Sequence, residues 1–418
     1  MADSVDASLP SIHRPTTADD VADLVLRAVQ ESVPLTIVAG GHGPWSHAPN
    51  DGLRIELGGL ADITVDGATV HVGGGAVWGD VAKALAAHDL ALSSGDTATV
   101  GVGGLTLGGG VGWMVRAWGL AVDQLIGAQV VTAGGEIVET SAVEHPDLFW
   151  ALRGGGGNFG VVTRFDFAAH PLPGIAFAES VIDGDAVSVL RAARDLLRDA
   201  PRELTATYMD VPAMDPSAPA GARLSAVWAA PDPERLGHVW EPITAIDGVR
   251  TEITTPAYRD ILVEMPQPNE SPDEPAAPPG FIGGNGLFAE LGDDLIERLV
   301  AFRRTYPASV IFLRSLGGAF GDVPQEHTAF PARAATWFVM AGAFDIPGMV
   351  DDATRAQIIA DWQAIEKGRL AEYGNFAATE RADAVRGMFT EAGYERLRQV
   401  KAQWDPNNVF RRNHNVAL

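Results

Sequence analysis

The chain has 418 residues, of which 46% are hydrophobic and 20% are charged. This composition is typical of a globular protein with a sizeable core, so it excludes disorder of the whole chain. Thirty Lys and Arg residues against 54 Asp and Glu residues give a net charge of −24, which disfavours binding to nucleic acid or to an anionic membrane. The sequence contains no cysteine, which excludes disulfides, thiolate metal ligands and cysteine nucleophiles.

Neither a secretory signal nor a membrane-spanning segment is visible in the sequence. Residues 1–15 lack a basic stretch followed by an apolar one. No apolar run approaches the roughly 18 residues that a spanning helix needs. We therefore expect a cytoplasmic protein that does not enter a membrane.

Short strands and helices alternate irregularly over the first part of the chain. Thr17 can cap a helix whose apolar residues recur with helical spacing, and residues 35–38 predict a strand that leads into Gly40. Asp66-Gly67 lies between two β-rich runs and predicts a hairpin. Further elements are predicted at residues 53–57 (strand), 80–88 (helix), 128–132 and 136–140 (paired strands), 147–152 (helix) and 161–167 (strand). This order is typical of an α+β fold and not of a doubly wound sheet.

The character of the chain changes after residues 170–174, His-Pro-Leu-Pro-Gly, which predict a boundary. Beyond it glycine becomes rarer and amphipathic stretches of helix length appear, such as residues 186–200. Residues 266–279 are rich in proline and acidic residues and predict a surface loop. A helix is predicted at residues 391–404. We expect two domains, one formed by residues 1–173 with 370–418 returning to it, and one formed by residues 174–369.

Three glycine-rich stretches lie within the first domain, at residues 40–43, 101–112 and 154–160. Glycine removes side chains from a turn, so that successive backbone N–H groups can converge on an anion such as a pyrophosphate. A tight turn with an exposed His42 is the alternative for the first stretch. The Gly-x-Gly-x-x-Gly spacing of nicotinamide enzymes and the Gly-Lys-Ser/Thr of Walker loops are absent at these places. Together the three stretches predict a backbone wrapped around one long anionic ligand.

These stretches resemble the flavin-binding module of the berberine bridge enzyme-like oxidoreductases, within the vanillyl-alcohol oxidase superfamily of FAD proteins. The matching segments are Gly40-Gly41-His42, residues 100–110 (VGVGGLTLGGG), residues 147–163 (DLFWALRGGGGNFGVVT), Tyr373-Gly374-Asn375, and residues 404–410 (WDPNNVF) with Asn413 and Asn415. The resemblance implies a two-subdomain PCMH-type FAD-binding domain. It also implies a substrate domain with an antiparallel sheet backed by helices.

The resemblance implies FAD as the cofactor and His42 as the residue joined to the 8α position of its ring. Relatives with a second link use a cysteine where this chain has Thr97, so only a single link can form here, and non-covalent FAD is the alternative. The other residues that the resemblance assigns to cofactor binding are Gly40, Gly41, Gly43, Val100, Gly101, Gly103, Gly104, Thr106, Gly108, Gly156, Asn158, Gly160, Val161, Val162, Asn375, Asn413 and Asn415.

The implied reaction removes hydride from an alcohol or amine carbon of a small molecule, or cyclises a secondary metabolite oxidatively. Dioxygen is the implied acceptor and gives hydrogen peroxide, because Val100 matches a position where valine accompanies reaction with dioxygen in this family. A dehydrogenase with another acceptor and a catalytically idle flavin-binding protein are the alternatives.

Tyr373 is implied as the catalytic residue that takes the substrate's proton. A phenol with a pKa of about 10 does so only where charge or hydrogen bonds lower that pKa. A half-buried tyrosine with a structural partner is the alternative.

The other polar residues indicate less about the function. His42 and His47 have no carboxylate partner nearby in the sequence, and no other set of side chains has metal-ligand spacing, so no metal site is predicted. No Gly-x-Ser-x-Gly motif supports a serine hydrolase. His327 and Arg333 can face the substrate, while an exposed histidine and a structural arginine are the alternatives.

Overall fold

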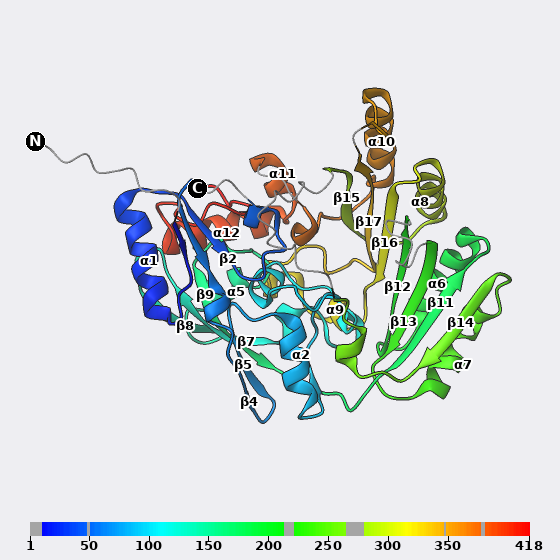
Figure 1. Ribbon diagram of the computed structural model, residues 1–418, viewed down its shortest axis with the longest axis horizontal. Coiled ribbons are helices and arrows are strands. Elements are labelled where there is room, and N and C mark those ends of the chain that lie inside the picture. Colours follow the sequence, from blue (N-terminus) through cyan, green and yellow to red (C-terminus); the bar gives the residue numbers. More distant parts are fainter. Residues whose placement is uncertain (1–10, 48–50, 213–220, 265–279, 347, 378–380) are drawn as a thin grey trace, which may run out of the picture.

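The structure is a computed structural model that describes residues 11–47, 51–212, 221–264, 280–346, 348–377 and 381–418. The surface loop predicted at residues 266–279 lies outside the described residues. Figure 1 shows two parts: the N-terminal elements and the C-terminal end of the chain lie on the left, and a large sheet with its helices lies on the right.

A small parallel sheet opens the fold. Its strands are β1 (Ser11–His13), β3 (Leu53–Glu56) and β2 (Leu35–Val38), in that order. The helix predicted after Thr17 is α1 (Ala18–Glu31), and its cap is the predicted one: Asp20 N donates to Thr17 Oγ1 and Thr17 N donates to Asp20 Oδ2. Such a reciprocal cap satisfies N–H groups that the first turn leaves free.

The second sheet of this part is antiparallel. Its order is β4 (Ile63–Asp66), β5 (Thr69–Gly73), β9 (Val161–Ala168), β7 (Leu125–Val131) and β8 (Ile137–Ser141). The hairpin predicted at Asp66-Gly67 is confirmed, because Asp66 pairs with Thr69 across the turn. The helices predicted at residues 80–88 and 147–152 are present as α2 (Trp78–Ala86) and α5 (Pro146–Leu152).

The glycine-rich stretch at residues 101–112 differs from the loop that glycine content predicts, because residues Val102–Leu107 form a short helix, α3. Val102 N donates to Ala76 O at 2.8 Å, and the Val102 and Leu107 side chains are buried in the core. Tertiary contacts therefore outweigh the low helix propensity of glycine here. Short elements join this region to its neighbours: η1 (Pro44–His47), η2 (Leu57–Gly59), β6 (Leu90–Ala91), α4 (Val115–Trp118) and η3 (Ala121–Gln124).

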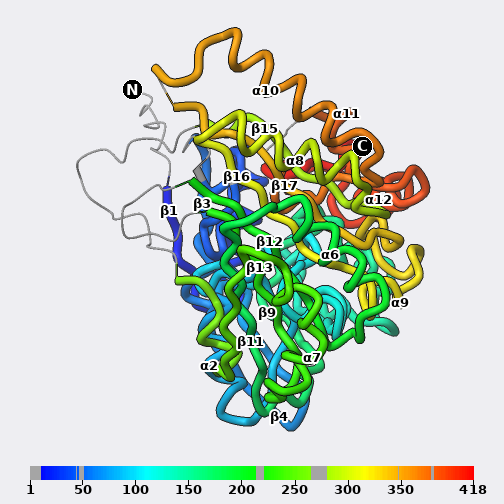
Figure 2. The backbone as a smooth tube through the Cα atoms, turned by 90° about the vertical axis from the view of Figure 1, so that its right-hand side faces the viewer, coloured from blue at the N-terminus to red at the C-terminus, as the bar shows by residue number. Residues whose placement is uncertain are grey.

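A seven-stranded sheet forms the other part. Its order is β14 (Val249–Thr254), β11 (Ala176–Ile182), β13 (Gly221–Trp228), β12 (Leu204–Val211), β16 (Ser309–Ser315), β17 (Trp337–Asp345) and β15 (Gly280–Phe288), and all neighbours are antiparallel. One face is covered by α6 (Ala186–Asp199), α7 (Pro233–Thr244), α8 (Asp293–Thr305) and α10 (Asp352–Ile365). Figure 2 shows α6, α7 and α8 on the viewer's side of this sheet. This arrangement confirms the predicted antiparallel sheet backed by helices.

The C-terminal segment returns to the first part of the fold (Figure 1). The helix predicted at residues 391–404 is α12 (Glu391–Trp404), and it packs on α5, where Trp404 Nε1 donates to Asp147 Oδ2 at 3.2 Å. The remaining short elements are β10 (His170–Pro171), η4 (Tyr258–Ile261), α9 (Ala319–Asp322), η5 (Gln325–His327), η6 (Gly374–Phe376) and α11 (Ala382–Gly387). Among the described residues, no helix has the length and apolar character needed to cross a bilayer.

Candidate cofactor and active site

Two of the glycine-rich stretches contact each other through their backbones. A Cβ atom on Gly40 would lie 2.2 Å from Gly101 N, and one on Gly101 would lie 2.3 Å from Gly40 N. Only glycine fits at both positions, so these two residues are required by the contact between the loops. Enclosed positions of the same kind, where a Cβ would meet other parts of the chain, are Gly103, Gly108 and Gly160.

Four other predicted glycines face open space. A Cβ on Gly41, Gly43 or Gly104 would meet no described atom within 4 Å, and one on Gly156 would meet only Asn158 Nδ2, at 3.7 Å. Gly41 and Gly156 also have positive φ values of 75° and 73°. These glycines therefore leave backbone accessible to a ligand, while the enclosed ones hold the loops in place.

Three predicted residues carry buried polar atoms that find no hydrogen-bond partner among the described residues. They are Thr106 Oγ1, Asn413 Oδ1 and Asn415 Oδ1. Buried polar atoms are nearly always hydrogen-bonded, and a bound ligand with polar groups would give these three atoms partners. A long ligand with several polar groups, such as FAD, fits this set.

Asn158 differs from those three residues, because both polar atoms of its side chain have hydrogen-bond partners within the protein. Its Nδ2 donates to Gly155 O and His414 O, and its Oδ1 accepts from Val416 N at 3.0 Å. It therefore ties the third glycine-rich stretch to the C-terminal tail. The other predicted residues of this stretch, Val161 and Val162, are buried in β9.

His42 lies in the first glycine-rich stretch, with an exposed side chain. Its Nε2 lies 2.9 Å from Thr99 Oγ1, and the ring nitrogen that does not contact Thr99 is Nδ1. Partial burial lowers the pKa of His42 and outweighs the opposite effect of a hydrogen bond to the Thr99 backbone, and this lowering favours the neutral imidazole. Thr99 was not singled out from the sequence, because only the contact between the loops brings it to His42.

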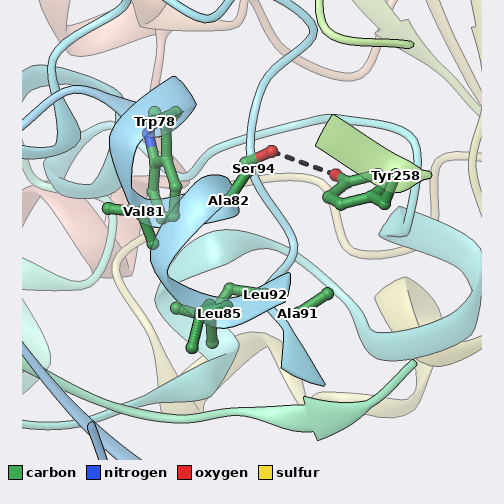
Figure 3. A pocket seen from close by; sticks show the side chains of 8 residues that line it. All are labelled: Trp78, Val81, Ala82, Leu85, Ala91, Leu92, Ser94 and Tyr258. Atoms are coloured by element: carbon green, nitrogen blue, oxygen red, sulfur yellow. Dashed lines mark hydrogen bonds between the residues drawn. The ribbon is translucent and has the colours of Figure 1, made fainter. Parts of the chain in front are cut away.

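Thr97 and Val100 lie half-buried in the segment that precedes α3. Thr97 pairs with Val263 in an isolated bridge, and Ser94 Oγ lies 3.0 Å from Tyr258 Oη. Figure 3 shows this hydrogen bond beside an apolar cavity of about 10 Å³ under α2, lined by Trp78, Val81, Ala82, Leu85, Ala91, Leu92, Ser94 and Tyr258. The cavity has room for about one water molecule, so it is a packing defect and not the cofactor site.

Tyr373 is buried, with 2% of its surface exposed. Its hydroxyl oxygen accepts hydrogen bonds from Gly110 N at 3.0 Å, Val111 N at 3.4 Å and Asn375 Nδ2 at 2.8 Å. Asn375 Nδ2 also donates to Leu105 O, which links Tyr373 to the end of α3. Burial raises the pKa of Tyr373 to about 12 even though all three hydrogen bonds lower it. This direction is opposite to the lowered pKa that a proton acceptor needs.

Tyr373 packs against Phe338 of β17, on the face of the seven-stranded sheet opposite its helices. Arg314, on β16, is fully buried, makes a two-fold ion pair with Asp96, and lies 4.3 Å from the centre of the Trp113 ring. The sequence carried a signal for it, since Arg314 is a lone charge at the end of the apolar run 310–313. Partly exposed apolar side chains adjoin it in cross-strand register, namely Met209, Phe312 and Met340.

Of the two residues with undecided roles, Arg333 is structural. Its guanidinium pairs with the Asp123 carboxylate at 2.8 Å, and both side chains are almost fully buried. His327 is exposed on η5, as the surface alternative predicts.

Comparisons with known proteins agree with this geometry. A family profile described as FAD binding domain matches residues 10–141, and one described as Berberine and berberine like matches residues 372–417. (R)-6-hydroxynicotine oxidase of Paenarthrobacter nicotinovorans is 38% identical over 196 residues, which are 46% of this chain and 43% of that relative. The FAD-linked oxidoreductase tazG of Aspergillus terreus is 27% identical over 427 residues, covering 97% of this chain and 86% of the relative.

A solved structure of glucooligosaccharide oxidase from Acremonium strictum has a TM-score of 0.82 and 25% identity, covering 97% of this chain and 91% of that chain. Its FAD is described as 6-S-cysteinyl and 8α-N1-histidyl. Both ends of the chain thus match the family that the sequence motifs indicate, and the fold matches throughout. The chain therefore belongs to the berberine bridge enzyme-like family of FAD-linked oxidoreductases.

Proposed function

We propose that this chain is an FAD-dependent oxidase that removes hydride from an alcohol or amine carbon of a small molecule, with dioxygen as acceptor giving hydrogen peroxide. The observation that carries the proposal is the position of Tyr373. Its hydroxyl is hydrogen-bonded to Gly110, just beyond α3, and to Asn375, whose side chain also donates to Leu105 O in α3. A proton-handling group and the cofactor-binding backbone thus adjoin, as oxidation at carbon requires.

In this proposal FAD supplies the hydride acceptor, and the chain positions it. Gly41, Gly43, Gly104 and Gly156 allow close backbone approach, and Thr106, Asn413 and Asn415 supply polar partners. His42 forms the single covalent link. Thr97 stands where a cysteinyl link would need a thiol, and the chain has no cysteine.

Tyr373 takes the proton that leaves the substrate hydroxyl or amine. Three N–H groups point at its oxygen and stabilise negative charge on it, which is the arrangement of an oxyanion site. Because burial raises its pKa to about 12, the phenol is largely protonated at pH 7. Proton acceptance then depends on a small phenolate fraction that grows with pH.

The substrate approaches from the seven-stranded sheet, so residues 174–369 form the substrate domain and residues 1–173 with 370–418 the FAD domain. Met209, Phe312 and Met340 offer an apolar surface, and the Arg314 charge is neutralised by Asp96. This combination supports an uncharged substrate with an apolar group beside the oxidised carbon. A cytoplasmic location stays the prediction made from the sequence.

Reoxidation of the flavin tests this proposal without a known substrate. The holoenzyme is photoreduced without air and then mixed with air-saturated buffer, beside free reduced FAD as the reference. Reoxidation faster than the reference, with one hydrogen peroxide per flavin, supports an oxidase. Reoxidation slower than the reference indicates a dehydrogenase with another acceptor. A flavin that no alcohol, sugar or amine reduces would indicate the catalytically idle alternative.

A further inference from the structure

We propose that Thr99 is a positioning residue for covalent flavin attachment, holding the His42 imidazole so that Nδ1 is the atom that bonds to the 8α carbon. The proposal rests on the single His42 link of the proposed function. The linked nitrogen corresponds to the N1 described for glucooligosaccharide oxidase, and the new element is the role of its neighbour Thr99.

Backbone hydrogen bonds and a close contact between two loops hold Thr99 and His42 next to each other. Thr99 Oγ1 lies 2.9 Å from His42 Nε2. The turn that carries Thr99 is held at the start of α2, where Trp78 N donates to Val100 O at 3.0 Å and Gly79 N donates to Ala98 O at 2.8 Å. The contact between Gly40 and Gly101 fixes the two loops against each other. The threonine hydroxyl therefore stays within reach of the histidine ring.

The chemistry of imidazole assigns the roles of its two nitrogens. A neutral imidazole carries a proton on one nitrogen and a lone pair on the other. The Thr99 hydroxyl can accept a hydrogen bond from Nε2–H, and in that tautomer the lone pair is on Nδ1, which makes Nδ1 the nucleophile. As Nδ1 forms a bond, positive charge develops on the ring, and the Thr99 oxygen stabilises it through Nε2–H.

The linking step balances with dioxygen as the oxidant. The bond between Nδ1 and the 8α carbon forms, and one C–H bond of the 8α methyl group breaks. The methyl proton and the Nε2 proton leave to solvent, which reaches the exposed His42, while two electrons stay on the flavin ring. Dioxygen takes up these two electrons with two protons and becomes hydrogen peroxide. The Thr99 hydroxyl can then donate to the deprotonated Nε2, because a hydroxyl both accepts and donates.

The test follows the rate of covalent attachment and not the activity. Apoprotein of the wild type, Thr99→Val and Thr99→Ser is mixed with FAD in air, and the flavin retained in acid-precipitated protein is measured over time. Losing a hydrogen bond to a charged group costs about 1.5–3 kcal/mol, so we expect Thr99→Val to slow attachment by about tenfold or more. We expect Thr99→Ser to restore the wild-type rate. Non-covalent FAD affinity should be the same in all three proteins.

Two controls make the result specific. Thr64→Val, at an exposed threonine on β4, should attach flavin at the wild-type rate, and His42→Ala should attach none. If Thr99→Val does not fold, Thr99→Ala takes its place. A wild-type rate in Thr99→Val, or a rate in Thr99→Ser as slow as in Thr99→Val, would overturn the role of Thr99. Flavin that leaves the wild-type protein on acid precipitation would instead refute the covalent link itself.

Discussion

Lys401 and Asp405 form an ion pair without solvent exposure, with 2.6 Å between Nζ and Oδ2. Lys401 Nζ also donates to Asn158 O at 2.8 Å and Phe410 O at 2.9 Å, and the Asp405 carboxylate accepts from Phe410 N. This network joins the end of α12 to the third glycine-rich stretch and to the tail that carries Asn413 and Asn415. The ion pair is therefore part of the network that positions the tail.

We predict that Lys401→Met lowers the free energy of unfolding by about 3–5 kcal/mol, because it leaves the Asp405 carboxylate buried without its partner. Urea unfolding of the apoprotein measures this change. The matched control is Lys83→Met, which removes an exposed ion pair with Asp80 and should change the value by less than about 1 kcal/mol. Equal effects of both substitutions would mean that the buried pair is not essential to the fold.

Replacing glycine by alanine should have opposite effects on stability at two positions of the same glycine-rich stretch. Gly101→Ala places a Cβ against the Gly40 backbone and should destabilise the apoprotein. Gly104→Ala meets open space within α3 and should stabilise the apoprotein by about 0.5–1 kcal/mol, because alanine favours a helix, while weakening FAD binding. Thermal unfolding and FAD titration of both variants check this. Wild-type FAD affinity in Gly104→Ala would show that the cofactor does not use this face.

The sequence predicted those features that depend on local pattern. The hairpin at Asp66-Gly67 and the helix after Thr17 follow from turn chemistry and capping, and both are present. The helix at Val102–Leu107 was not predicted, because its stability comes from contacts with residues distant in the chain. Asn158 illustrates the same limit: its partners are residues of the C-terminal tail, which no local pattern reveals.

Buried tyrosines should make the protein sensitive to alkali. Burial raises the pKa values of Tyr258 and Tyr373 to about 12, whereas in the unfolded chain they are about 10. Below about pH 10 both states keep these protons, so their contribution to stability is fully present. As the pH rises toward 12, only the unfolded state loses them, and the free energy of unfolding falls.

Urea unfolding between about pH 8 and 12 measures this loss, which should be about 1.4 kcal/mol per pH unit for each tyrosine above about pH 10. Tyr258→Phe removes one of the two groups and should reduce the slope by that amount. An unchanged slope would mean that Tyr258 keeps an ordinary pKa in the folded protein.

The role of Tyr373 predicts how flavin reduction depends on pH. If the phenolate accepts the substrate's proton, the rate rises about tenfold per pH unit from neutral pH upward, with no plateau below about pH 10. The rise follows from the raised pKa, since only the deprotonated phenol is active. An alcohol that reduces the flavin is the suitable substrate for stopped-flow measurement, because it does not titrate in this range.

Tyr373→Phe should lower the rate by about 10²–10⁴-fold and abolish its pH dependence. The matched control is Tyr208→Phe, which removes another buried hydroxyl, on the helix-covered face of the sheet. It should leave the pH dependence of flavin reduction as in the wild type. A rate independent of pH in the wild type, or a rise that persists in Tyr373→Phe, would assign proton transfer to another group. Tyr373 would then act through its hydrogen bonds to Gly110 and Asn375, by holding the end of α3 in place.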